Sequence, residues 1–310
     1  MRSIIAGVIC IFASSMAWAA TPNAECKVVR FSDVGWTDIT ATTALTSQVL
    51  RSLGYEPESK VLSVPVTYRS MKNEDIDVFL GNWMPTMTGD LQPYLDDGSV
   101  ESLRANLEGA KYTLAVPAYA YEAGVTSFAD IADNAEKFDG KIYGIEPGND
   151  GNRLIQEMID SDAFGLGDFR LVASSEAGML SQVGRAVKRD EWVVFLAWEP
   201  HPMNANFNLE YLKGGDDYFG PNFGGATVHT NVRSGYLDNC PNLNTFFNNL
   251  EFSLAMENEV MGMILNDGMD PDIAALEWLQ ANPGVLGKWL AGVKTIDGKP
   301  AMPAAKKALK

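Results

Sequence analysis

The sequence predicts an α/β protein of two domains, each a mostly parallel sheet flanked by helices. Three observations support this fold class. Short apolar runs alternate with helical patterns along most of the chain. The length of 310 residues corresponds to about two average domains. Two further extended segments, 111–117 and 226–230, fit strands that cross from one domain to the other.

The first 19 residues have the pattern of a secretory signal peptide. Arg2 supplies the positive charge, 4–12 an apolar core that is too short to span a membrane, and 17–19 a small-x-small cleavage site. Cys10 lies inside the apolar core and lacks the surroundings of a lipoprotein cysteine. We expect cleavage after residue 19, a mature chain of 310 − 19 = 291 residues and a location in the periplasm.

Composition narrows the function. The formal charge is −16, and it becomes −16 − 1 = −17 when Arg2 is removed. Nucleic acid requires concentrated Lys and Arg, so we exclude it as a partner, whereas a cationic ligand is compatible with the charge.

The mature chain keeps two cysteines, Cys26 and Cys240. In an oxidising compartment a disulfide is favoured over two free thiols, and it would bring the start of the chain to its last quarter.

The N-terminal elements are predicted in order. Leu45, Val49 and Leu53 have helical spacing, and Gly54 is a typical stop after a helix. The predicted strands are 28–32, 61–66 and 75–80, the predicted helix is 39–53, and 111–117 is the first crossing strand.

The remaining elements follow the same alternation and then become mostly helical. The glycines at 214–215 and 220–225 suit a second crossing, although a surface loop would have the same composition. The predicted helices are 128–135, 154–158, 179–187, 243–265, 271–280 and 285–290, and the predicted strands are 141–145 and 192–197.

Large polar or aromatic side chains recur where predicted strands end or cross, which is the edge at which α/β proteins bind ligands. These residues are Trp36, Trp83, Tyr112, Asn149 and Trp198. Each tryptophan alone could pack the core, and Asp38 alone could cap a helix. Together the rings favour a quaternary ammonium ligand, which has no N–H to donate and is attracted by ring faces.

The patterns of known enzymes are weak in this chain. It has two histidines among 310 residues and contains neither H-E-x-x-H nor G-x-S-x-G. His201 lies between two prolines, and no Ser or Cys partner is evident for it. We therefore expect a protein that is not an enzyme and that has no cofactor and no metal.

Five motifs carry a resemblance to a known family. They are DVGWTDIT (33–40), GNWMPTM (81–87), GAKYTLA (109–115), IEPGNDGNR (145–153) and WEPHPMNANF (198–207). In this order they resemble the choline-binding proteins of bacterial ABC importers, within the wider family of periplasmic glycine betaine and choline binders. The resemblance implies a type II-like periplasmic-binding-protein fold that closes about a two-segment hinge. Domain I would comprise 20–111 and 224–310, and domain II 112–223.

The resemblance also implies a ligand site. Trp36, Trp83, Tyr112 and Trp198 would form an aromatic box for the trimethylammonium group. Asp38 and Asn149 would hold the ligand hydroxyl, and Asp38 would also counter the cation. Expected partners are choline, with acetylcholine or betaines bound more weakly, and the permease subunits of an ABC importer. We expect the protein to be a monomer.

Asp38 separates choline from its nearest competitors. Glycine betaine and proline betaine carry a carboxylate, which Asp38 would repel, whereas choline carries a hydroxyl that can donate to it. Arg153 and His201 are the nearest candidate donors for a carboxylate, so the sequence leaves a betaine-binding protein open. It also leaves open an exported enzyme that acts on choline esters and a receptor that serves a sensor.

Overall fold

The first third of the chain builds one lobe of the molecule. Its strands are β1 (Val28–Asp33), β2 (Glu56–Val61) and β3 (Val78–Met84), and its helices are α1 (Thr37–Ser52), α2 (Val64–Lys72) and α3 (Thr88–Asp96). β1 pairs in parallel with β2 and with β3, as expected for strands joined by crossover helices. The computed structural model describes residues 24–309, so the predicted signal peptide lies outside the described residues.

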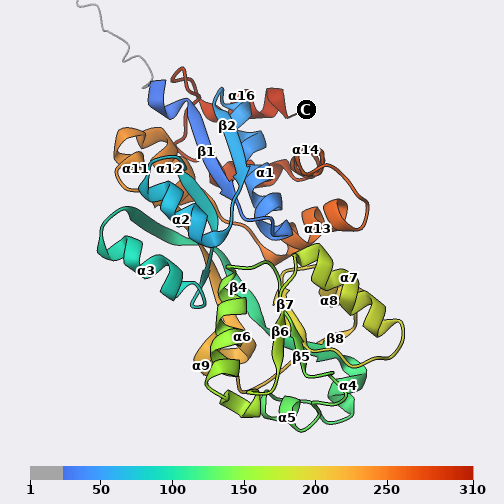
Figure 1. The fold of residues 1–310 in the computed structure, drawn as a ribbon. Coiled ribbons are helices and arrows are strands. Elements are labelled where there is room, and N and C mark those ends of the chain that lie inside the picture. The colour runs from blue at the N-terminus through green and yellow to red at the C-terminus, as the bar shows by residue number, and fades with distance from the viewer. Residues whose placement is uncertain (1–23, 310) are drawn as a thin grey trace, which may run out of the picture.

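The middle of the chain builds a second lobe, which lies below the first in Figure 1. Its strands are β5 (Lys141–Tyr143), β6 (Arg170–Val172), β7 (Phe195–Glu199) and β8 (Leu209–Tyr211). Its helices are α4 (Ala118–Glu122), α5 (Ala129–Ala132), α6 (Asp150–Asp160), α7 (Glu176–Val187), α8 (Met203–Asn206) and α9 (Asp216–Phe219), with a 3-10 turn at Ala163–Gly165. β5 is parallel to both β6 and β7.

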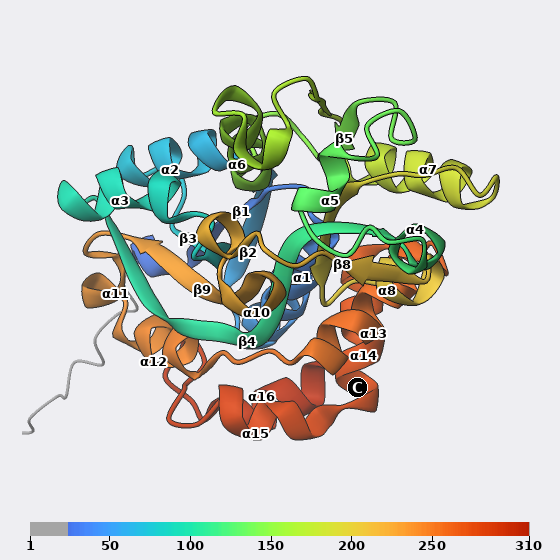
Figure 2. The same cartoon turned by 90° about the horizontal axis from the view of Figure 1, so that it is seen from below.

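Two long strands connect the lobes, β4 (Val100–Pro117) and β9 (Gly225–Arg233), and the short helix α10 (Pro221–Gly224) precedes β9. β4 and β9 are antiparallel to each other, and β4 curves alongside β9 in Figure 2. β9 also pairs with β3, and β4 pairs with β7 and β8. Within residues 24–309, nine strands therefore form one mixed sheet with the path β2-β1-β3-β9-β4-β7-β5-β6 and β8 beside β4.

After β9 the chain returns to the first lobe as helices. They are α11 (Tyr236–Asn239), α12 (Pro241–Asn249), α13 (Leu254–Leu265), α14 (Pro271–Ala281), α15 (Leu286–Trp289) and α16 (Ala301–Ala308), with a 3-10 turn at Pro283–Val285. Most of them gather on one side of the molecule, and α2, α3 and α6 lie on the other (Figure 2). No helix described between residues 24 and 309 is long and apolar enough to cross a bilayer.

α1 is rich in buried threonines because it lies between the sheet and α13 and α14. Buried hydroxyls need hydrogen-bond partners. The Thr42 hydroxyl donates to the carbonyl of Asp38 (3.0 Å), and the Thr46 hydroxyl donates to the carbonyl of Thr42 (2.7 Å). These two hydroxyls are thus satisfied by carbonyls of the helix itself, which allows the helix to be covered on both sides.

Two predicted elements are wrong. The predicted strand 61–66 ends at Val61, and Val64 begins α2, with Pro65 in its first turn. Pro is favoured at this position because its missing N–H needs no partner there. The predicted helix 243–265 is two helices, α12 and α13. In the segment between them, the Phe252 amide donates to the carbonyl of Asn106 in β4 (2.7 Å).

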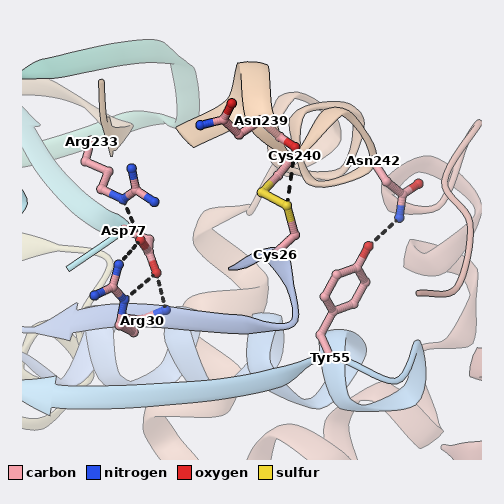
Figure 3. Close-up of a disulfide and its surroundings, with 8 residues drawn as sticks. All are labelled: Cys26, Arg30, Tyr55, Asp77, Arg233, Asn239, Cys240 and Asn242. Atoms are coloured by element: carbon pink, nitrogen blue, oxygen red, sulfur yellow. Dashed lines mark hydrogen bonds and ion pairs between the residues drawn. A yellow bond between two sulfur atoms is a disulfide. The ribbon is translucent and has the colours of Figure 1, made fainter. Parts of the chain in front are cut away.

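A disulfide ties the start of the chain to its last quarter (Figure 3). Cys26 and Cys240 are bonded, with their Cα atoms 5.7 Å apart, which confirms the predicted pair. Nearby, the buried Asp77 carboxylate accepts hydrogen bonds from Arg30 Nη2 (2.6 Å) and Arg233 Nε (2.7 Å). These bonds join β1, the start of β3 and the end of β9. The part of the first lobe around the disulfide is therefore held together by ion pairs as well as by the disulfide.

Candidate functional site

One carboxylate folds the turn between β1 and α1. Asp33, the last residue of β1, accepts a hydrogen bond from the Gly35 amide (2.7 Å) and one from the Thr40 hydroxyl (2.8 Å). Gly35 has a φ of +80°, which favours glycine because it has no Cβ. The turn places Trp36 and Asp38 at the carboxyl edge of the parallel strands, where ligands bind in α/β proteins.

The four rings predicted as a box meet around one cavity. Tyr112 and Trp198 are direct register partners in β4 and β7. The ring centroid of Tyr112 lies 5.7 Å from that of Trp83 and 6.4 Å from that of Trp198. Trp36 joins them from the start of α1. The residues that line this aromatic cavity are Trp36, Asp38, Trp83, Tyr112, Ile145, Asp150 and Trp198.

Both lobes contribute to the aromatic cavity. Trp36 and Trp83 belong to the first lobe and Trp198 to the second, while Tyr112 lies on a strand that links them. The Trp36 indole N–H donates to Glu146 Oε1 of the second lobe at 2.6 Å, so one ring of the box is itself bonded across the cleft. A ligand held by these rings would therefore bridge the two lobes.

Two buried carboxylates share the aromatic cavity. Asp38 Oδ2 accepts a hydrogen bond from Trp83 Nε1 (3.1 Å), and Asp150 Oδ1 accepts one from Asn149 Nδ2 (3.0 Å). Within the described part of the chain, Asp38 Oδ1 and Asp150 Oδ2 accept none. A buried carboxylate oxygen without a donor is destabilising, so these two oxygens suit a ligand that brings positive charge or a donor.

Burial controls the protonation of both carboxylates. Loss of hydration is the main cause, and the negative charge of Glu176 the second, of a rise in the pKa of Asp38 from 3.8 to about 8. Burial likewise raises the pKa of Asp150 from 3.8 to about 7. A nearby cation would lower both pKa values, because it favours the charged form of each group. The cavity is therefore electrostatically prepared for a cation.

Asn149, which the sequence predicts to contact the ligand, is not among the described residues that line the cavity. Its Oδ1 accepts hydrogen bonds from the Asn152 amide (3.0 Å) and from the Tyr112 hydroxyl (3.1 Å). The first bond caps the N-terminus of α6. Since its Nδ2 holds Asp150, Asn149 orients two residues of the cavity, Tyr112 and Asp150.

The two candidate donors for a carboxylate also have other partners. Arg153 Nη2 donates to Asp90 Oδ2 (2.9 Å) and to the carbonyl of Thr86 (3.0 Å), so it joins α6 of the second lobe to α3 of the first. His201 Nε2 lies 3.2 Å from Glu176 Oε1. Among the described residues that line the cavity, none is Lys, Arg or His.

Sequence reasoning missed Asp150 and Ile145. Asp150 is the first residue of α6, where an acidic residue usually does no more than complement the helix dipole. Its position directly after Asn149, in a turn that follows a predicted strand, was the available signal. Ile145 ends that predicted strand and supplies an apolar wall.

No group of three or more His, Cys, Asp or Glu side chains within residues 24–309 is arranged to hold a metal ion.

Known proteins share both the fold and the family of this chain. It matches the family model OpuAC, the substrate binding domain of ABC-type glycine betaine transport system, over residues 27–281. It is 62% identical to an ABC-transporter choline binding protein solved in complex with choline (TM-score 0.91) and in an unliganded semi-closed conformation (TM-score 0.85). Each comparison covers 92% of this chain and 99% of that chain.

A more distant structure has the same fold. Lactococcal OpuAC in its closed-liganded conformation, complexed with glycine betaine, is 26% identical with a TM-score of 0.76. The comparison covers 85% of this chain and 99% of that chain. These superpositions confirm the predicted two-lobed α/β fold of periplasmic binding proteins.

Proposed function

Because the chain belongs to the family of substrate-binding domains of ABC-type glycine betaine transport systems, we propose that it captures choline in the aromatic cavity and delivers it to an ABC permease. It acts in the periplasm as a monomer and makes or breaks no bond. The observation that carries this proposal is the pairing of four rings with two carboxylates whose free oxygens lack donors. The choline complex of a protein 62% identical supports it.

The ring faces account for the quaternary ammonium group. Such a group has no N–H, so it gains only dispersion and cation–π attraction, about 0.5–2 kcal/mol for each ring face. Four faces provide a gross attraction of about 2–8 kcal/mol before the cost of ordering the ligand. The aromatic cavity offers rings from both lobes, so this attraction also favours the closed arrangement.

The two carboxylates account for choline rather than a betaine. The carboxylate of a betaine would lie among like charges, and no Lys, Arg or His is present among the described residues that line the cavity. Arg153 is held by Asp90, and His201 lies beside Glu176. The hydroxyl of choline can instead donate a hydrogen bond to one of these carboxylates. Choline should therefore bind more tightly than glycine betaine or proline betaine.

We assign the two carboxylates different roles. Asp38 is held by Trp83, a ring of the box, and so counters the ammonium charge. Asp150 is held by Asn149, which also bonds the Tyr112 hydroxyl, and so accepts a hydrogen bond from the choline hydroxyl. In this proposal Asp150 takes the hydroxyl contact that the sequence predicted for Asp38 and Asn149, and Asn149 positions it.

Titration calorimetry of the purified mature chain with a ligand panel tests the function. The panel is choline, acetylcholine, glycine betaine, proline betaine and carnitine. We expect choline to bind most tightly, acetylcholine more weakly because it lacks the donating hydroxyl, and the zwitterions weakest. Tighter binding of glycine betaine than of choline would contradict the assignment. Incubation with choline esters serves as the control for catalysis, and we expect no turnover.

The box itself is tested by Trp198→Ala. This change removes one ring face that closes the cavity from the second lobe. We expect choline affinity to fall by more than tenfold, since about 0.5–2 kcal/mol of cation–π attraction is lost together with the shape of the cavity. Circular dichroism should show an intact fold. Calorimetry that gives the wild-type affinity would remove Trp198 from the proposed site.

A further inference from the structure

The N-terminus of α1 is capped by a side chain from the other lobe. The helix begins after Trp36, whose indole nitrogen carries a hydrogen and cannot accept one from the helix amides. Thr37, the first residue of α1, donates from its amide to Glu176 Oε2 (3.0 Å) and from its hydroxyl to Glu176 Oε1 (2.5 Å). Glu176 begins α7 of the second lobe. A carboxylate at this end of a helix satisfies a free amide and complements the dipole.

Glu176 is held in place on its own lobe. Its side chain is 4% exposed, and His201 Nε2 lies 3.2 Å from its Oε1. The Met203 amide donates to His201 Nδ1 at 2.9 Å. Since Nδ1 accepts, the ring hydrogen is on Nε2 and is donated to the carboxylate. Glu176 thus has donors from both lobes, and its contact with His201 lies within its own lobe.

This contact is connected to both walls of the aromatic cavity. Thr37 lies between Trp36 and Asp38 in the chain, so capping its amide fixes the backbone that carries both side chains. On the other side, the His201 ring packs against Trp198, with centroids 4.9 Å apart. Glu176 is not among the described residues that line the cavity. It therefore does not touch a ligand in the cavity, although its charge does act on Asp38.

We propose that Glu176 is a closure latch, a positioning residue that caps α1 across the cleft when the lobes close and so sets the affinity of the cavity for every ligand by the same factor. The proposal rests on the proposed capture of a quaternary ammonium compound. A ligand that needs the closed arrangement binds with an apparent affinity that scales with the closed fraction. Opening exposes Glu176 and the Thr37 amide to water, which replaces their bond only in part.

The test measures affinity for two ligands that differ in their hydroxyl. Choline and tetramethylammonium are titrated by calorimetry into the wild-type chain and into Glu176→Ala. We expect the variant to weaken both ligands by about tenfold and by an equal factor, because the loss lies in closure. Small-angle scattering at saturating choline should give the wild-type radius of gyration, since enough ligand still closes the variant.

Two further variants make the test specific. Thr37→Val keeps the volume and the amide but removes the hydroxyl bond; we expect about a threefold loss, and no further loss in the Glu176→Ala background. The matched control is Asp270→Ala. Asp270 caps α14 by accepting from the Asp272 amide (2.9 Å), and Asp272 in turn bonds Gln48 and Arg51, so the described bonds of this cap stay within the first lobe. Its loss should lower the melting temperature and leave choline affinity unchanged.

The outcomes separate the latch from the function. Wild-type protein that binds neither ligand would overturn the proposed function and the latch together. Wild-type binding with less than a twofold change in Glu176→Ala would overturn the latch alone. A loss confined to choline would overturn the common factor and make Glu176 a contact for the hydroxyl. If Glu176→Ala fails to fold, Thr37→Val and Glu176→Gln carry the test, and wild-type affinity in both overturns the latch.

Discussion

The free oxygens of Asp38 and Asp150 are the residue-scale feature that makes the cavity selective. Rings alone would hold any quaternary ammonium group, because cation–π attraction depends on charge and shape. The carboxylates require two further features of the ligand, a compensating positive charge and a hydrogen-bond donor. Since each has one oxygen already held, by Trp83 or by Asn149, the second oxygen has a fixed position. A ligand that supplies both features relieves two buried acceptors at once.

The assigned roles predict different losses for two matched variants. Asp150→Asn should weaken choline about threefold to tenfold more than it weakens tetramethylammonium, because a charge-assisted bond to the hydroxyl is lost. Asp38→Asn should weaken both ligands by a similar factor, because both carry the ammonium charge. Calorimetry with the two ligands measures these ratios. The reverse pattern would return the hydroxyl to Asp38, as the sequence predicted.

The raised pKa values predict that choline binding depends on pH. Burial holds the pKa of Asp38 at about 8 and that of Asp150 at about 7 in the absence of a cation. A bound cation lowers both pKa values, so binding near pH 7 releases protons. Affinity should therefore rise between about pH 6 and pH 8, at most about tenfold per pH unit for each titrating group, and level off above.

Calorimetry in two buffers of different ionisation enthalpy measures this proton release directly. The apparent binding enthalpy at pH 6.5 should differ between the buffers in proportion to the protons released. Asp38→Asn should remove part of that difference, since it removes the group with the higher pKa. Identical enthalpies in both buffers, with an affinity that is flat from pH 6 to pH 8, would contradict the protonation states argued above.

The first turn of α6 is the element that positions the side chains on one side of the cavity. Asn149 caps it, Asp150 lines the cavity, and Gly151 allows close packing. A Cβ atom built on Gly151 would lie 2.3 Å from the Tyr112 hydroxyl and 2.7 Å from Leu196 Cδ2. Real Cβ atoms do not approach that closely, so glycine is required here by its neighbours.

Gly151→Ala should therefore lower choline affinity even though alanine is the better helix former. Tyr112 would have to move, and it is both a ring of the box and the partner of Asn149. We expect a loss of about tenfold or more, measured by calorimetry. Gly262→Ala on α13 is the matched control, because a Cβ there meets nothing within 4 Å. It should raise the free energy of unfolding by up to about 1 kcal/mol and leave affinity unchanged.

The same elements show what local sequence can and cannot predict. Trp36, Trp83 and Trp198 were identifiable because large rings at strand ends have few structural reasons to recur. Asp150 and Glu176 were not, because an acidic residue in the first turn of a helix is ordinary, and only the approach of a second element reveals its partner. The strand predicted over 61–66 failed because alternating valines outweighed Pro65, which fits the first turn of a helix.

At the scale of the whole molecule, different bonds maintain each lobe and bring the lobes together. The contacts of Glu146, Glu176 and Arg153 run between the lobes, around the aromatic cavity. The disulfide and the Asp77 ion pairs lie near each other within the first lobe (Figure 3), and the start of β1 beside them lies at the end of that lobe far from the second lobe (Figure 1). Stability of a lobe and affinity for ligand should therefore respond to different substitutions, because the contacts that govern them are separate.

The disulfide provides the sharpest test of this separation. Cys26 precedes β1, and Cys240 joins α11 to α12, so the bond closes a sequence separation of 214 residues without crossing the cleft. Replacing both with Ser should lower the free energy of unfolding by about 2–5 kcal/mol, because the unfolded chain regains the freedom of a long loop. Urea denaturation measures that loss, and calorimetry of the folded variant should give the wild-type choline affinity. Reduction of the wild-type protein serves as the control. An affinity lowered by more than about threefold in a folded double variant would mean that the far end of the first lobe is coupled to closure.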